Sequence, residues 1–325
     1  MDITKFSTEE EYLSQMHAGA LLNPRIDSTF KALFTQPTQD SREALHAFLE
    51  AATERKIKSF ELTATDAPVE FGGQRNVNYD IACIFDDGLS AEIEMQAFNQ
   101  KYDYGKRAEY QVARLETTYL KKGETWEKAP TVYQISILDF NYAPKSSSEK
   151  NDANIKKTES ECSPVSRYSM RTKDGKELSN SLNIVFVELP KVQQLEQSLE
   201  TNTSLENWAI FLKEADDPEK TSVIQKLTQK EAGLMQAKNS LSSISVNQDL
   251  WIAQYHQELK ERDYISGLAA AKIEGIGIGR AEGILDTKIE TARNYLKLGL
   301  TAEQVAVGSG LPLEEVRKIE AAIIR

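Results

Sequence analysis

The feature that most constrains the fold is a hairpin-like stretch in the first third of the chain. Residues 77–85 and 89–98 are strand-like, and the turn signal Asp86-Asp87-Gly88 separates them. A three-residue loop with glycine in the left-handed region suits this turn, and such a loop pairs Phe85 with Leu89. We therefore expect a β-sheet built around an antiparallel hairpin.

Four polar side chains share one face of this predicted hairpin. Glu92, Glu94 and Gln96 alternate along the second strand, so they point to the same side. With the three-residue loop, Asp80 lies directly opposite Glu94, where Cβ atoms are about 4.5–5.5 Å apart. A two-residue loop would shift the register by one residue and put Asp80 and Glu94 on opposite faces.

Two carboxylates this close repel each other and need a shared proton, a basic partner or a divalent cation. Mg²⁺ held by one or two carboxylates, water and a substrate phosphate is one solution, and Gln96 can then orient the water or a phosphate oxygen. The other interpretation is a structural acidic face at a sheet edge, and the residues alone leave both open. The three histidines and two cysteines lack zinc-ligand spacing, which leaves carboxylates to bind any metal.

Further elements alternate between helix and strand along residues 1–200. Residues 144–166 are polar, and we expect an exposed loop or a disordered insertion there. Helical patterns occupy residues 30–34, 41–52, 102–122 and 204–271, and strand patterns occupy residues 131–140 and 182–189.

The helix that follows the hairpin is basic. Residues 101–122 hold six basic and three acidic side chains, in a chain whose net charge is −11. Arg107, Tyr110 and Arg114 are three and four residues apart and line one stripe. Such a stripe can bind a phosphate backbone, although a solvated amphipathic face explains it equally well.

Composition excludes several classes of protein. A length of 325 residues corresponds to roughly two domains. The chain has no run of about 18 apolar residues, so we expect no membrane span. The N-terminus has neither the basic nor the apolar part of a signal peptide, so we expect a cytoplasmic protein. The acidic balance argues against a sequence-independent coat of nucleic acid.

The C-terminal part of the chain has two motifs. Gly275, Gly277 and Gly279 form a glycine-rich segment that lacks the preceding strand of a phosphate-binding loop, so a helical linker is favoured. Residues 286–325 have the pattern of a helix-turn-helix, with Thr301 and Gln304 as a capping box and a turn over residues 308–310. The last helix carries Glu314, Glu315 and Glu320 against Arg317 and Lys318, which favours a structural or oligomerising tail over base recognition.

Several motifs together resemble a known family. They are Asp80, the I-E-M-Q segment that ends at Gln96, the helix with Arg107 and Tyr110, an ILDF strand, and the opening D-S-T-F-K-A-L-F of residues 27–34. In this order the motifs resemble the PD-(D/E)XK nuclease superfamily, and most closely its bacterial recombination-promoting nuclease and transposase family.

The resemblance implies an α/β fold with a restriction-endonuclease-like core, in which helices flank a mixed central sheet, followed by an α-helical C-terminal region. It implies metal-dependent hydrolysis of DNA phosphodiester bonds, linked to recombination or mobile elements. Gln96 stands where the superfamily usually has lysine, and a neutral amide stabilises a developing negative charge less well. The alternative is therefore a DNA-binding or assembly protein that keeps the fold with weak or no catalysis.

The resemblance also implies roles for single residues. Asp80 and Glu94 would bind Mg²⁺ or Mn²⁺, with Gln96 as the third catalytic residue. Asp27 and Glu92 are candidate additional acids. The residues expected to bind DNA phosphates are Lys31, Arg107, Tyr110 and Arg114.

The expected domain organisation has three parts. Residues 1–200 form the nuclease-like domain, residues 201–285 a helical region and linker, and residues 286–325 the helix-turn-helix-like tail. The C-terminal helical region is the expected site of any homo-oligomer contact.

Overall fold

The structure is a computed structural model that describes residues 8–66, 75–97, 103–119, 123–142 and 163–323. The chain divides into two compact units, Met1–Gln257 and Glu258–Arg325. The domain boundaries expected near residues 200 and 285 rested on composition and stay predictions. The first unit includes the helices between residues 204 and 244.

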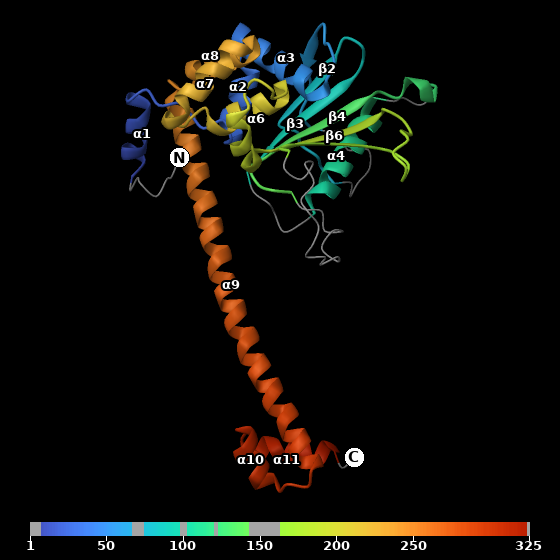
Figure 1. Cartoon of the computed structure of the whole chain (residues 1–325), viewed down its shortest axis with the longest axis vertical. Helices are drawn as coiled ribbons and strands as arrows, with labels where there is room; N and C mark the ends of the chain where they lie inside the picture. Colours follow the sequence, from blue (N-terminus) through green and yellow to red (C-terminus); the bar gives the residue numbers. More distant parts are fainter. Residues whose placement is uncertain (1–7, 67–74, 98–102, 120–122, 143–162, 324–325) are drawn as a thin grey trace. The chain divides into compact units, whose positions relative to one another are not determined.

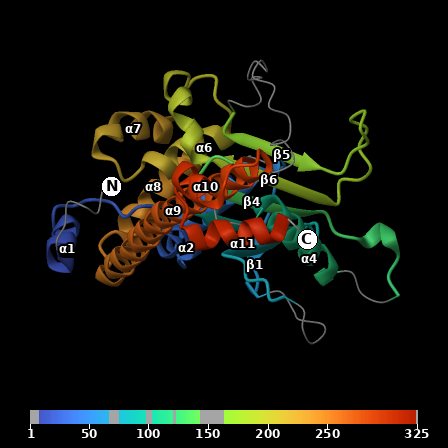
Figure 2. The ribbon, with the colours of Figure 1, turned by 90° about the horizontal axis from the view of Figure 1, so that it is seen from below.

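A mixed sheet organises the first unit (Figure 1). In the described residues it has six strands in the order β1-β2-β3-β4-β6-β5, with β1 and β5 at opposite edges (Figure 2). The β3–β4 and β4–β6 pairs are parallel and the other pairs are antiparallel. The strands are β1 (Phe60–Leu62), β2 (Ile81–Phe85), β3 (Ser90–Gln96), β4 (Val132–Leu138), β5 (Val165–Ser169) and β6 (Leu182–Glu188).

The central hairpin has the predicted register. The Phe85 N–H donates to the Leu89 carbonyl over 2.7 Å, and Gly88 has a φ of +80° in the left-handed region. Ala82 therefore pairs with Glu92, and Asp80 lies one residue before the first strand of the hairpin. The three-residue loop is confirmed, and the two-residue alternative is not adopted.

Helices that precede the strands in the sequence and helices that follow them together cover one face of the sheet (Figure 1). Apolar side chains at helical spacing on α3, such as Leu45 and Phe48, are fully buried in the main core. Trp208 packs against Phe48 with the ring centroids 5.4 Å apart. This layer consists of α2 (Asp27–Thr35), α3 (Gln39–Thr53), α6 (Ser204–Glu214), α7 (Thr221–Lys230) and α8 (Ala232–Ile244).

A single helix of the described chain, α4 (Tyr104–Tyr119), packs on β4 and β6 at the opposite face. Its buried apolar residues, among them Ala108, Val112 and Leu115, form two small clusters with strand residues. Between α4 and the sheet lies a layer of buried polar side chains. Its members on the strands are Ser90, Glu92, Glu94, Gln96, Gln134 and Ser136.

The helix α9 (Gln248–Lys297) is continuous over 50 residues, so Gly275, Gly277 and Gly279 lie inside a helix. A phosphate-binding loop is therefore excluded at this segment, since its strand–loop–helix context is absent there. Helices α10 (Ala302–Ser309) and α11 (Leu313–Ile323) follow.

The second unit has a small hydrophobic core of its own, which includes Ala292, Val305 and Val316. The capping box of Thr301 and Gln304 forms as predicted. The turn is shorter than expected, because α10 continues through Ser309 and only Gly310 adopts the left-handed conformation.

The remaining elements are short. They are α1 (Glu9–His17) and the 3-10 helices η2 (Trp126–Lys128), η4 (Leu189–Gln197) and η5 (Pro218–Lys220). Most of the polar stretch 144–166 lies outside the described residues, but its last two residues begin β5, which corrects the expectation of a loop there. None of the described helices combines the length and apolar composition of a membrane crossing.

Candidate active site

The predicted site residues meet at one end of the sheet. Because β2 runs antiparallel to β3, the start of β2 and the end of β3 lie together, and this brings Asp80 beside Met95. The neighbouring strand β4 ends at the same end of the sheet, where the Asp139 N–H donates to the Gln96 carbonyl over 3.0 Å. The carboxyl ends of parallel strands are the usual location of ligand sites in α/β folds.

Asp80 is held by one backbone group and one cation. Its Oδ2 accepts a hydrogen bond of 2.8 Å from the Met95 N–H, and its Oδ1 lies 3.1 Å from Lys31 Nζ. Burial raises the pKa of Asp80, and the nearby Asp27 carboxylate raises it further, while the Met95 N–H and Lys31 oppose both effects. The carboxylate is thus held in place and costly to keep charged.

Lys31 lies on α2 and bridges the carboxylates of Asp27 and Asp80. Its Nζ lies 3.0 Å from Asp27 Oδ1, one helical turn earlier, in addition to its contact with Asp80. Partial burial lowers the pKa of Lys31, but Asp80 and Asp27 outweigh this effect and raise it overall. Lys31 is therefore charged at neutral pH.

Glu94 is more deeply enclosed. Arg107 forms an ion pair with it and Gln111 donates a hydrogen bond to it, both from α4. Its side chain is 5% exposed, and this burial raises its pKa despite the two partners. The Arg107 guanidinium also donates to Gln96 Oε1 over 3.3 Å, so one cation joins the ends of the predicted motif.

Glu92 lies one pleat deeper and is fully buried. Within the described residues, neither carboxylate oxygen has a hydrogen-bond partner of ordinary geometry, although the adjacent Gln134 amide favours the charged form. Burial raises the pKa of Glu92 well above its usual range, and the charges of Glu94 and Asp80 raise it further. Burial thus favours the protonated form of Glu92, which lies beneath the site.

Carboxylates outnumber their contacting cations around the candidate site. Asp27, Asp80 and Glu94 outnumber the two cations that contact them, Lys31 and Arg107. Asp80 also raises the pKa of Glu94, because the two negative charges repel each other. In the described part of the chain, no group of three His, Cys, Asp or Glu side chains converges closely enough to hold a metal. Binding of a divalent metal by Asp80 and Glu94 therefore stays a prediction, in which water and substrate oxygens would complete the coordination shell.

The predicted phosphate-binding stripe on α4 is divided by burial. Arg107 contacts the site, Tyr110 is 39% exposed, and Arg114 is 7% exposed and lies in the polar layer under the helix. The helical spacing was correct, but spacing does not fix how far a helix rotates toward the sheet. Their binding of DNA stays a prediction.

Two groups near the site were not anticipated. Gln111, one helical turn after Arg107, could have been identified by its spacing. Arg25, in contrast, pairs with Asp139 over 3.3 Å and with the buried Asp216 over 3.6 Å. Lys213 completes the network at 2.7 Å from Asp139. These partners are far apart in sequence, and no local signal links them.

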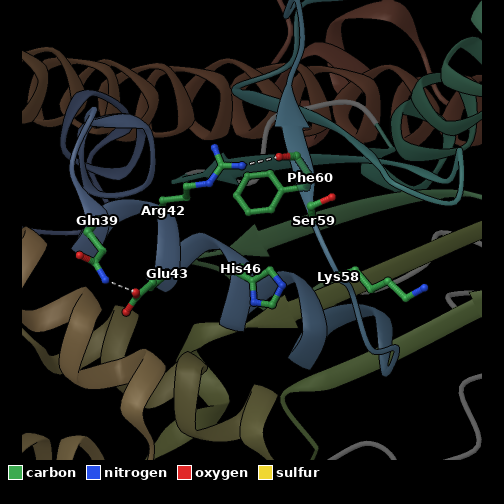
Figure 3. Close-up of a pocket in the computed structure, with 7 residues that line it drawn as sticks. All are labelled: Gln39, Arg42, Glu43, His46, Lys58, Ser59 and Phe60. Atoms are coloured by element: carbon green, nitrogen blue, oxygen red, sulfur yellow. Dashed lines mark hydrogen bonds between the residues drawn. The ribbon is translucent and has the colours of Figure 1, made fainter.

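A separate pocket of about 350 Å³ opens between α3 and the segment before β1 (Figure 3). Arg42 lies over the Phe60 ring and donates to the Phe60 carbonyl over 2.8 Å, while Gln39 donates to Glu43. Gln39 and Glu43 thus bind each other, and the carboxylates of the candidate site do not line this pocket.

Comparison with known proteins gives one match. A family model described as PD-(D/E)XK nuclease family transposase matches residues 24–271, which include all the predicted site residues. The search of curated proteins found no match, and the search of solved structures also found none.

Proposed function

Because the chain belongs to the PD-(D/E)XK nuclease family of transposases, we propose that it is a metal-dependent DNA endonuclease. Family membership supports a nuclease or transposase-related role with DNA as the partner. One observation supports the proposal of metal-dependent endonuclease activity. Asp80, Glu94 and Gln96 lie at one end of the sheet, with Lys31 and Arg107 beside them. The family's link to transposition supports a role in recombination or mobile elements.

In this proposal Asp80 and Glu94 hold Mg²⁺ or Mn²⁺. A bound divalent cation supplies a water of lowered pKa and polarises the phosphate. Gln96 positions the attacking water or a phosphate oxygen through its amide, and Arg107 fixes both Gln96 and Glu94. Burial favours the protonated form of Glu92 below them, which limits the negative charge on this strand face.

Cleavage of supercoiled plasmid by the purified protein tests the proposal. We expect nicking or linearisation with Mg²⁺ or Mn²⁺, none with EDTA, and at least a hundredfold loss in Asp80→Asn. Asparagine keeps an acceptor for the Met95 N–H and removes only the charge, so the variant should stay folded. Exposed Asp249 on α9, replaced by Asn, is a matched control and should cleave like the wild type.

A second readout separates metal binding from turnover. A ligand that binds only the folded state stabilises it, so Mn²⁺ should raise the Tm of the wild type but not of Asp80→Asn. No cleavage by folded protein with any divalent metal would overturn the endonuclease proposal. That result would favour a DNA-binding or assembly protein that retains the fold.

A further inference from the structure

We propose that Lys31 is a catalytic residue that stabilises the negative charge developing on the scissile phosphate, a role for which neutral Gln96 is unsuited. This inference rests on the proposed endonuclease function and assigns its missing cation. During hydrolysis the oxygen of water bonds to phosphorus, and the bond from phosphorus to the leaving sugar oxygen breaks. The leaving oxygen keeps the bonding electrons and takes one proton of the water, while the other proton stays on the new phosphate or passes to solvent.

Negative charge accumulates on the non-bridging phosphate oxygens in this step, and a preorganised cation there lowers the barrier. Among the described contacts of the two predicted metal ligands, the cations are Lys31 on Asp80 and Arg107 on Glu94. The choice between them depends on how well the partner carboxylate tolerates the loss of its cation when that side chain moves to a phosphate.

Arg107 is committed to a buried partner. The Glu94 side chain is only 5% exposed, and removing its ion pair would leave a charge uncompensated inside the protein. Arg107 also holds the Gln96 amide at 3.3 Å. Arg107 therefore organises the site and is a poor candidate for a group that moves to the substrate.

Lys31 can turn to a phosphate at a lower cost. Its partners are more accessible than Glu94, with the Asp27 side chain 45% exposed and the Asp80 side chain 17% exposed. Asp80 keeps the Met95 N–H when Lys31 leaves, and Asp27 can be solvated. The flexible four-carbon stem of lysine allows the head group to swing while α2 stays fixed.

One consequence distinguishes this role from a structural one. Without metal, Lys31 contacts the same Asp80 carboxylate that is proposed to hold the cation. Removing the lysine charge should then leave metal affinity unchanged or higher while turnover falls. A lysine that merely holds Asp80 in position would lose metal affinity and turnover together.

The test compares Lys31→Gln, Lys31→Arg and the control Lys226→Gln, an exposed lysine on α7, in the full-length protein. Plasmid cleavage gives kcat and KM, and calorimetric titration with Mn²⁺ gives metal affinity without DNA. We expect Lys31→Gln to lower kcat about a hundredfold, as loss of one charge-stabilising donor does, with KM changed less than threefold. Its Kd for Mn²⁺ should be equal to or below that of the wild type.

Lys31→Arg should retain at least ten times the kcat of Lys31→Gln, and Lys226→Gln should match the wild type. Circular dichroism checks that each variant is folded. The inference is overturned if Lys31→Gln cleaves within twofold of the wild type, or if it loses Mn²⁺ affinity together with kcat. Failure of the wild type to cleave with any metal is a separate result, which overturns the proposed function and this inference with it.

Discussion

At the scale of single residues, the fully buried Glu92 makes the stability of the protein depend on pH. Its pKa is raised above the ordinary value of 4.5 by burial, and then by Glu94 and Asp80. The folded state therefore binds this proton more tightly than the unfolded chain. Stability from this group is present at pH values below 4.5 and is lost as pH rises toward the folded-state pKa.

Glu92→Gln should consequently stabilise the metal-free protein at neutral pH. Glutamine has the shape of the protonated acid and has no acidic proton to lose. We expect a gain in stability at neutral pH, because burial raises the pKa of Glu92 and so makes loss of its proton costly in the folded state. Thermal unfolding in EDTA between pH 4.5 and 8 measures it. The variant should lose less stability than the wild type across this range, and an equal loss would contradict a raised pKa of Glu92.

At the scale of elements, the loop between β2 and β3 sets the geometry of the site. Its three residues bring Ala82 opposite Glu92 and let the Asp80 carboxylate reach the Met95 N–H at 2.8 Å. A change of one residue in loop length would move the even-numbered side chains of β2 to the other face. The register of the two strands therefore depends on the number of residues in the loop and not on any side chain of the site.

Deletion of Asp87 should therefore abolish cleavage and the Mn²⁺-induced rise in Tm, although every site residue is kept. Gly88→Ala is the matched control, because it keeps the loop length and strains only the left-handed φ of +80°. We expect a cost of about 1–2 kcal/mol in stability for the control, with cleavage retained. If the deletion variant cleaves as well as the control does, the loop does not set the site.

At the scale of the whole molecule, each unit closes its own core. The buried cluster of the first unit ends at Trp251, whereas that of the second begins at Ala292. Between them α9 carries large exposed apolar side chains, such as Ile273 at 72% and Ile276 at 61% exposed. Exposed apolar residues gathered on one segment are typical of an interaction surface.

A chain that stops after Arg262 should keep the fold and the metal-dependent cleavage of the full chain, with a Tm within about 4 °C of it. Light scattering of both forms tests the predicted homo-oligomer contact through the C-terminal helices. We expect the full chain to have the mass of an assembly and the shortened chain that of a monomer. Equal association states would remove the tail from the interface.

The sequence by itself determined the local features of this protein. Alternation along β3 and the Asp86-Asp87-Gly88 turn were sufficient to predict the register around Asp80, because both follow from backbone geometry over a few residues. The capping box at Thr301 was predicted for the same reason. The edge strands β1 and β5 were not predicted, since short strands with one neighbour carry little pattern.

Only the tertiary structure decided which charges meet. Lys31 reaches Asp80 and Arg107 reaches Glu94 because α2 and α4 pack against the sheet, and no spacing in the chain encodes those distances. The same packing buried Arg114 and left Tyr110 exposed on one predicted stripe. Helix rotation and docking depend on contacts between segments distant in sequence, so the partners of the site residues could be read only from the fold.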